Sequence, residues 1–304
     1  MPEPALCAVQ FIHPGDEHRP DAPGAGRKGW NTEGHQRKFM RTEGASLDAK
    51  GAAHDGEVLF WGEWEPPSTV EDLEALGPGY PRYLHRPFLE VRTEFARYQN
   101  TDPFVFGDEF LYTGCQQWRG KPHGNPVQLR WLLPGSIVLF GSCAGDRFLL
   151  DTVLVVRDFI DHDRDTYRDV LRGAVPDAYW TVTLGPWYSG LPDGRTFRLY
   201  RGATPANAVN DMFSFFPCLR ADAPATRGFS RPDLSDLSCV NPRLRQGWRA
   251  TKLGNIAETA NVWHTVRQAV LDQGFELGVR AAIPPTVSVP SSKPPWAMYR
   301  SQIR

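Results

Sequence analysis

Residues 136–140 read SIVLF and residues 148–156 read FLLDTVLVV, with the turn sequence GSCAGD between them. Two β-branched apolar runs joined by a short glycine-containing turn are typical of a β-hairpin. Asp151 and Thr152 interrupt the second run, so both need hydrogen-bond partners if that strand is central. This hairpin pattern predicts that the middle of the chain forms central strands of a sheet.

The flanking sequence predicts further strands and a few helices. Residues 5–12 (ALCAVQFI) and 57–64 (EVLFWGEW) read as strands, and shorter aromatic strands are expected at 180–184, 196–200 and 213–216. Short helices are expected at 68–76 and 163–172, and residues 256–274 carry an amphipathic helix pattern that ends at a glycine. We therefore expect an α+β fold with a mixed or antiparallel, partly barrel-like sheet, a few short helices and one longer C-terminal helix.

Length and composition limit the class of protein. The 304 residues with 41% hydrophobic content can form one large domain over residues 1–304, with a possible division into a sheet-rich part (1–160) and a second lobe (161–304) that ends in the amphipathic helix. No apolar run reaches membrane-spanning length and no leader peptide is recognisable, so we expect a soluble cytoplasmic protein that does not bind membranes. Nothing indicates a protein partner. Neither a dinucleotide-binding nor a P-loop glycine motif occurs.

Charge is distributed in patches, although the net charge is only -1. Basic residues gather in residues 27–41 and 241–252 and could contact phosphates; the alternative is that both are solvated surface. The candidate phosphate-binding residues are Arg37, Lys38, Arg41, Arg243, Arg245 and Arg249. The five cysteines are odd in number, widely spaced and form no CxxC pair, so neither a disulfide framework nor a cysteine-based zinc site is expected. The sequence predicts no cofactor.

Residues 98–110 (YQNTDPFVFGDEF) hold the densest set of chemically useful side chains. A carboxylate and carboxamides stand beside aromatic rings, which is the combination needed to stack a planar base and read its edge. The structural alternative is an Asx-type turn in which Asn100 and Asp102 cap the local backbone.

Residues 99–104 (QNTDPF) resemble the Gly-Gln-Asp-Pro-Tyr motif of uracil-DNA glycosylases, although the leading glycine is replaced by Tyr98 and two residues are inserted. The segments HPGDEH, WGEW, NTDPFVFG and GSIVLFGS are similar to bacterial proteins encoded near nucleic-acid modification and phage-defence genes. These resemblances imply a DNA glycosylase that flips a modified base out of foreign DNA and excises it. Within the motif, the resemblance implies Asp102 as the carboxylate that positions water and Phe104 as the stacking ring.

Base excision requires a carboxylate near the sugar, groups that bind the leaving base, and cations for phosphates. We assign Asp102 and Asn100 to catalysis, and Gln99, Phe104, Tyr98 and Trp30 to binding of the substrate, which is DNA.

Three alternatives stay open. A non-enzymatic reader could hold a modified base in a barrel. Residues 198–205 (RLYRGATP), with Ser214 and Glu276, resemble the Arg, Ser and Glu order of NAD-dependent ADP-ribosyltransferases; there the resemblance implies Arg201 as the arginine. The N-terminal group His13, Asp16, Glu17 and His18 could form a polar turn, contact phosphate or bind a metal.

Overall fold

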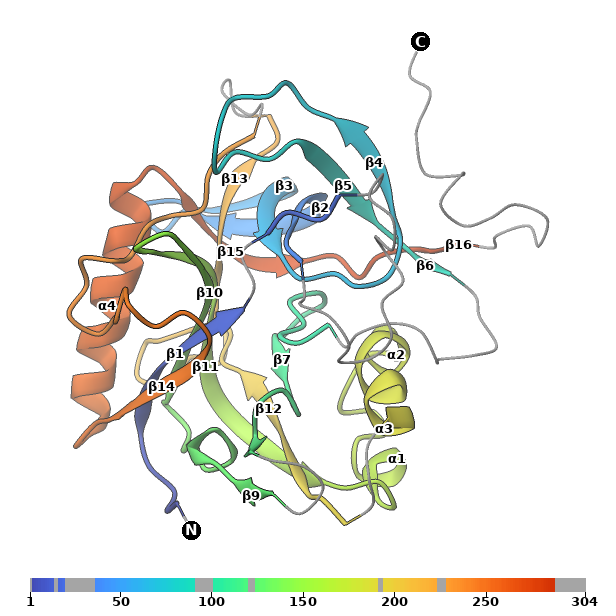
Figure 1. Cartoon of the computed structure of the whole chain (residues 1–304), viewed down its shortest axis with the longest axis vertical. Coiled ribbons are helices and arrows are strands. Elements are labelled where there is room, and N and C mark those ends of the chain that lie inside the picture. The colour runs from blue at the N-terminus through green and yellow to red at the C-terminus, as the bar shows by residue number, and fades with distance from the viewer. Residues whose placement is uncertain are drawn as a thin grey trace.

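The computed structural model describes residues 2–13, 16–19, 36–90, 101–119, 124–190, 194–222 and 228–287. Most of the strands form two six-stranded sheets (Figure 1). The first sheet has the order β14 (Gly247–Lys252), β1 (Cys7–His13), β10 (Ile137–Ala144), β11 (Arg147–His162), β12 (Phe197–Gly202) and β7 (Leu111–Tyr112). The second has the order β15 (Glu276–Ala281), β13 (Phe216–Arg220), β3 (Ala53–Gly62), β2 (Lys38–Leu47), β5 (Tyr83–Pro87) and β4 (Ser68–Asp72).

The first sheet is built around the hairpin expected from the sequence. β10 and β11 pair antiparallel, with a register shift between Phe140 and Gly141. A side chain at Gly141 could not be accommodated, because its Cβ would lie 2.3 Å from the carbonyl oxygen of Leu149. β1 pairs parallel to β10, which places His13 opposite Ser142 at the carboxyl ends of both strands. The predicted strand at 5–12 and the predicted hairpin are confirmed.

The second sheet closes partly on itself. β15 pairs with β13 on one side and with β2 on the other, so that β2, β3, β13 and β15 form a ring. Phe60 of β3 and Phe216 of β13 are fully buried in this ring of strands, with ring centroids 4.3 Å apart. The expected α+β class with a mixed, partly barrel-like sheet is confirmed.

Helices are short except for one. They are η1 (Gln128–Arg130), α1 (Tyr167–Val170), α2 (Asp177–Tyr179), the π-helical turn η2 (Trp180–Leu184), α3 (Gly185–Gly190) and α4 (Ile256–Asp272). Two strand pairs complete the fold: β6 (Leu89–Glu90) with β16 (Thr286–Val287), and β8 (Trp118–Arg119) with β9 (Asn125–Pro126).

The longest helix, α4, covers one face of the first sheet (Figure 1). Asn255 caps its N-terminus by accepting a hydrogen bond from the Glu258 amide, and the Glu258 carboxylate accepts one from the Gly254 amide. Trp263, Val266 and Val270 pack on the apolar side chains of β10 and β11.

Three expectations need correction. Residues 68–72 form strand β4, which pairs with β5, rather than a helix. Ser68 and Val70 are buried, Thr69 between them is half-buried and Glu71 is exposed, a two-residue period. Residues 180–184 form the π-helical turn η2 rather than a strand. The long helix is not C-terminal, since β15 and β16 follow it.

The hydrophobic core joins both halves of the chain. One cluster contains Val9 and Phe11 of the first sheet together with Met40, Phe60 and Phe216 of the second. The first sheet likewise combines strands from residues before and after 160. The division at residue 160 stays a prediction, and the cluster shows that the two parts share side-chain packing.

Candidate functional site

Five ionisable side chains meet in the interior between the two sheets. His13 ends β1, Arg37 precedes β2, Glu63 follows β3, Asp151 belongs to β11, and Arg231 lies in a loop. Each of them is less than a tenth exposed. We call this group the buried ionic centre. Charged side chains are rarely buried to this extent unless they are paired or functional.

Arg37 connects the two sheets. Its Nη1 donates a hydrogen bond to Glu63 Oε2 at 2.9 Å, and its Nε lies 3.1 Å from Asp151 Oδ2. Arg231 binds the other oxygen of Asp151 at 3.2 Å and donates to Ser142 Oγ at 2.7 Å. The centre therefore alternates cations and anions from both sheets.

His13 completes the centre on the side of the first sheet. Its Nδ1 lies 3.3 Å from Glu63 Oε2, the oxygen that also accepts from Arg37. The imidazole packs against Phe11 and Phe140, with centroid distances of 4.6 and 5.8 Å. A histidine held by a carboxylate in apolar surroundings is an arrangement suited to moving a proton.

The electrostatics of the centre keep its cations charged. Burial alone would lower the pKa of Arg37, but the carboxylates of Asp151 and Glu63 raise it above its ordinary value. Burial lowers the pKa of Arg231, and Asp151 opposes that shift. Two buried guanidinium groups are thus matched by two buried carboxylates.

Lys38 lies beside the centre and differs from it. Its Nζ donates to the carbonyl oxygen of Pro66 at 2.8 Å, and no ion pair joins it to a carboxylate in the described part of the chain. Burial lowers the pKa of Lys38 to about 8, with Glu65 opposing the shift. His85 lies nearby; its Nδ1 is 2.7 Å from Ser68 Oγ, and burial lowers its pKa well below the ordinary value, with Lys38 and His18 contributing.

Asp102 is buried and holds a turn. It is 1% exposed, and its two oxygens accept hydrogen bonds from the amides of Thr113 at 2.9 Å and Cys115 at 3.2 Å. The turn that it caps is distant in sequence, so the Asx-type local turn does not describe these contacts. They are the contacts of a structural carboxylate, and the catalytic role of Asp102 stays a prediction that this geometry does not favour.

The remaining residues predicted around Asp102 divide into two groups. Phe104 is fully buried and packs edge-on against Phe106 and Tyr179, so it is a core ring rather than an exposed stacking surface. Asn100, Gln99, Tyr98 and Trp30 lie outside the described residues. Thr101 joins the segment after β3 to η2, because its Oγ1 accepts from the Glu65 amide and its own amide donates to the carbonyl oxygen of Val182.

The predicted phosphate-binding residues do not form two surface patches. Arg37 and Lys38 are buried, because the start of β2 lies between the two sheets. Arg41 forms an ion pair with Glu57 in the wall of an open groove of about 460 Å³ beside the β2–β3 hairpin. The expectation of a surface footprint from the N-terminal patch is therefore wrong for Arg37 and Lys38.

The second basic stretch is at the surface. Arg243, Arg245 and Arg249 are exposed. Arg245 pairs with Asp146, whereas Arg243 and Arg249 have no ion pair with any residue that the structure describes. β14 pairs antiparallel to β1, with Gly247 opposite Ile12, so the start of β14 lies next to His13.

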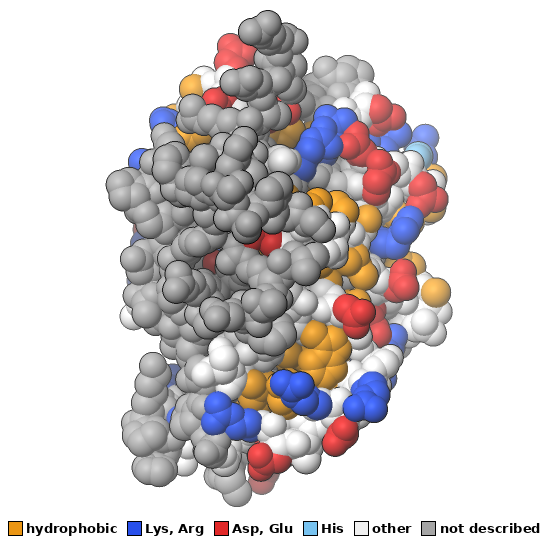
Figure 2. Space-filling model, turned by 90° about the vertical axis from the view of Figure 1, so that its right-hand side faces the viewer, with side chains coloured by type: hydrophobic (Ala, Val, Ile, Leu, Met, Phe, Trp, Pro, Cys, Tyr) orange, Lys and Arg blue, Asp and Glu red, His pale blue; other side chains and the backbone are white. Residues whose placement is uncertain are grey.

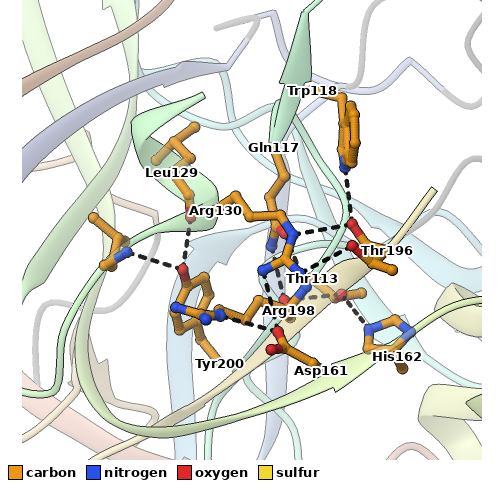
Figure 3. Close-up of polar contacts among 11 residues, drawn as sticks. Thr113, Gln117, Trp118, Leu129, Arg130, Asp161, His162, Thr196, Arg198 and Tyr200 are labelled. Carbon is orange, nitrogen blue, oxygen red and sulfur yellow. Dashed lines mark hydrogen bonds and ion pairs between the residues drawn. The ribbon is translucent and has the colours of Figure 1, made fainter. Parts of the chain in front are cut away.

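A second polar cluster lies where the end of β11 meets the start of β12 (Figure 3). Arg130 Nη1 and Arg198 Nε converge on one oxygen of Asp161, at 3.1 and 3.0 Å, and Arg130 also binds the backbone and side-chain oxygens of Thr196. We call these four residues the edge network. Both guanidinium groups lie over the ring of Trp131, at 5.0 and 5.1 Å from its centroid.

The edge network continues into uncharged contacts. Gln117 pairs with the backbone of Arg198, and Tyr200 bridges Leu132 and Leu129 (Figure 3). His162 contacts Thr113 Oγ1 at 2.9 Å, and burial lowers its pKa to about 3, so this imidazole is uncharged near neutral pH. These bonds fasten η1 to β11 and β12 of the first sheet and account for the cluster structurally.

The residues that resemble an ADP-ribosyltransferase are held by other partners. Arg201 pairs with Asp158, and Ser214 Oγ accepts from the Val155 amide. Glu276 is the first residue of strand β15, not the end of a helix, and binds Arg220 and Ser46. No hydrogen bond or ion pair joins any two of these three described residues.

Sequence reasoning identified part of the centre. Asp151 was expected to need partners, and Arg37, Arg231 and Ser142 supply them. His13 was assigned to the N-terminal group that could form a polar turn, contact phosphate or bind a metal. Glu63 was missed, and the available signal was a carboxylate between two tryptophans in WGEW, where an apolar strand end carries an acid.

Two further searches bear on the function. Within the described ranges, no group of three or more His, Cys, Asp or Glu side chains is arranged to hold a metal ion. No helix in those ranges is both long and apolar enough to cross a membrane. On the face that carries α1 to α3, acidic and basic side chains alternate around a hydrophobic patch, so the part of this face that is described has no single sign of charge (Figure 2).

Comparisons of the chain with protein-family models, with curated proteins and with solved structures found no match.

Proposed function

We propose that the chain is a DNA glycosylase that removes a modified base from foreign DNA, with the carboxylate of Glu63 and the imidazole of His13 at the reacting centre. The observation that carries the proposal is the contact of Glu63 Oε2 with both Arg37 and His13 in the interior between the sheets. Excision of a base needs a carboxylate beside the sugar, and Asp102 is occupied with the Thr113–Cys115 turn.

The reaction would follow from the positions of these groups. A water oxygen forms a bond to C1′ while the bond from C1′ to the base nitrogen breaks, and the electron pair leaves with the base. The proton from the water passes to the His13–Glu63 pair, and the departing base takes a proton from solvent. Arg37 holds the Glu63 carboxylate in place, and the negative charge of that carboxylate stabilises the cationic sugar.

Exposed cations within and just before β14 support nucleic acid as the substrate. Arg243 and Arg249 have no ion pair in the described part of the chain, and the start of β14 lies beside the end of β1 that carries His13. Such exposed arginines can bind the phosphates of a nucleic-acid strand.

The direct test is release of the base from phage-type modified DNA by the purified protein. Glu63→Gln keeps the size of the side chain and removes its charge, and we expect it to slow base release by about 10²- to 10⁴-fold. Glu57→Gln, which alters an ion-paired surface carboxylate, is the matched control and should retain activity. Full activity in Glu63→Gln would remove Glu63 from the mechanism, and loss in Asp102→Asn alone, with an intact fold, would restore Asp102.

The proposed binding of DNA phosphates by Arg243 and Arg249 is tested separately, by measuring DNA affinity at increasing salt concentration. Arg243→Gln and Arg249→Gln should each reduce the slope of log affinity against log salt by about 1, because each removes one phosphate contact. Arg172→Gln, on the exposed surface of the loop after α1, should leave the slope unchanged.

A base reader without catalysis is the alternative. It needs a cavity inside the closed ring of strands, where Phe60 and Phe216 are fully buried and in contact. Tight binding of modified DNA with no change in the mass of the DNA would support the reader over the glycosylase.

A further inference from the structure

The first part of β3 has an edge that no strand covers in the described part of the chain. β13 pairs with β3 only as far as Val58, and one more bond runs from the Ala221 amide to the carbonyl oxygen of Glu57. Over residues 53–56, β3 pairs with β2 alone among the residues that the structure describes. The second sheet therefore has a gap beside this part of β3, where a further strand could lie.

The direction of the backbone groups along this edge follows from the bond at Glu57. Residues of an antiparallel strand alternate between those that bond to the neighbour on one side and those that point both backbone groups to the other side. The Glu57 carbonyl oxygen accepts from β13 and so points away from β2. Ala53 and Asp55 share its direction and present their N–H and C=O groups to the gap. His54 and Gly56 bond to β2 instead.

The open groove of about 460 Å³ described above lies along this edge. Glu57 and Val58 are neighbours on β3 and point to opposite faces of the sheet, yet both line the groove, which therefore wraps around the edge. A Cβ atom built on Gly56 would meet no atom within 4 Å. An uncovered strand edge in an open groove can pair with an extended segment of another chain.

The edge lacks the side chains that commonly prevent such pairing, which are proline and outward-pointing lysine. Its sequence over residues 53–56 is Ala-His-Asp-Gly. The carboxylate of Asp55 is bound by Arg280 of β15, with 2.8 Å between Oδ1 and Nη2. Because this charge is already matched within the sheet, it does not oppose the addition of a strand.

The charges in the groove favour a basic partner. Arg41 in its wall pairs with Glu57. Arg220, the other arginine in the wall, pairs with Glu276. Asp222 also lines the groove, is exposed, and has no ion pair with any residue that the structure describes. It would attract a lysine or arginine on an added strand, whereas a second copy of this edge would bring a like charge.

We propose that the edge of β3 at Ala53–Gly56 binds an extended, basic segment of a protein partner, which adds to the sheet as a strand. The segment exchanges backbone hydrogen bonds with Ala53 and Asp55, and one of its basic side chains pairs with Asp222. The proposal goes beyond the proposed function and does not depend on it, since the groove and the buried ionic centre share no residue.

The experiment uses the full chain and two fluorescein-labelled octapeptides, one of alternating lysine and valine and one of alternating glutamate and valine. Fluorescence anisotropy measures their affinities. We expect the lysine peptide to bind about fivefold more tightly, and Asp222→Asn to reduce this preference by about two- to fivefold, the contribution of one exposed ion pair. Asp236→Asn, at another exposed carboxylate outside the groove, is the matched control and should keep the preference.

The backbone contacts are tested with Ala53→Pro. Proline removes the N–H that faces the gap and leaves the bonds of His54 and Gly56 to β2, so the affinity for the lysine peptide should fall at least about fivefold. Ala49→Pro is the matched control, because it lies outside the groove at the second position of the turn closed by the bond from the Gly51 amide to the Asp48 carbonyl oxygen. Thermal unfolding verifies that both variants fold.

Amide hydrogen exchange of the wild type gives a readout that charge attraction alone would not produce. The lysine peptide should slow exchange at Ala53 and Asp55 at least about fivefold, because these amides gain partners. Exchange at His54 and Gly56 should stay unchanged, because their amides already bond to β2. This pattern decides the matter if Ala53→Pro does not fold.

Three results would each overturn the proposal: equal slowing at all four amides, an affinity that Ala53→Pro does not lower in the folded state, or no binding of the lysine peptide at millimolar concentration. Sedimentation of the wild type tests the other occupant. A dimer whose dissociation speeds exchange at Ala53 and Asp55 would assign the edge to a second copy of the chain and would likewise refute the basic partner.

Discussion

The buried ionic centre and the edge network use the same residue types in opposite ways. In the edge network two guanidinium groups share one carboxylate, Asp161, which is about half exposed, and backbone oxygens and aromatic rings complete their contacts. In the centre, two guanidinium groups meet two carboxylates, and all four are removed from water. The edge network is explained by the strands that it fastens together. Attachment of the sheets does not explain the buried ionic centre in the same way, because well-packed apolar side chains could join the sheets without the free-energy penalty of removing four charges from water.

The largest expected effect that tests this difference is on Asp151. Asp151→Asn leaves Arg37 and Arg231 short of one buried negative charge, so the free energy of unfolding should fall by about 3–5 kcal/mol. Chemical denaturation at neutral pH measures it. A loss below about 1 kcal/mol would mean that water reaches the centre and that its charges are not truly buried.

An intermediate effect is expected at Lys38, and it depends on pH. Below about pH 8 the amine is protonated in both folded and unfolded chains, so the wild type carries the whole penalty of burying the charge. Between about 8 and the ordinary value of 10.5 the folded chain binds fewer protons than the unfolded chain, so the stability of the wild type rises with pH. Lys38→Met should thus be more stable than the wild type near pH 7, with a gap that narrows as the pH rises.

Denaturation curves of both proteins at pH 7, 9 and 10.5 check this prediction. Lys50→Met supplies the baseline, because that exposed side chain should give no gap that varies with pH. A constant difference between Lys38→Met and the wild type would show that the Lys38 amine titrates normally.

The smallest effect is expected in the edge network. Asp161→Asn should change the free energy of unfolding by less than about 1 kcal/mol, because its carboxylate is half exposed, the Arg130 guanidinium keeps its bonds to Thr196, and Arg198 stays stacked on Phe159 and Trp131. A loss comparable to that of Asp151→Asn would erase the distinction between the two clusters.

The fold was predictable where local patterns and tertiary packing agree. The hairpin of β10 and β11, strand β1 and helix α4 each carry a clear period and a recognisable turn or cap. The segment that begins at Ser68 was wrongly predicted as a helix, because a serine followed by acidic residues is typical of a helix N-terminus. In the structure it forms a strand because it pairs with β5. Residues 180–184 have the β-branched and aromatic composition of a strand, but in the folded protein they form a π-helical turn.

The site was less predictable, because its members come from five separate segments. Asp151 could be flagged because a buried strand acid needs partners, but the sequence does not say that Arg37 and Arg231 are those partners. Arg37 and Lys38 look like surface cations in a basic stretch, and only the position of β2 between the sheets buries them. Asp102 was chosen from its neighbours in sequence, whereas its contacts lie eleven and thirteen residues away.

The bridge made by Arg37 has a mechanical meaning. Glu63 belongs to the segment after β3 of one sheet and Asp151 to β11 of the other, and a single guanidinium group holds both. An anionic guest that competes with either carboxylate for this group would loosen one sheet from the other while it binds. Binding of such an anion in the interior and the attachment of the two sheets to each other are therefore thermodynamically coupled. The difference between the melting temperatures with and without the anion would measure this coupling.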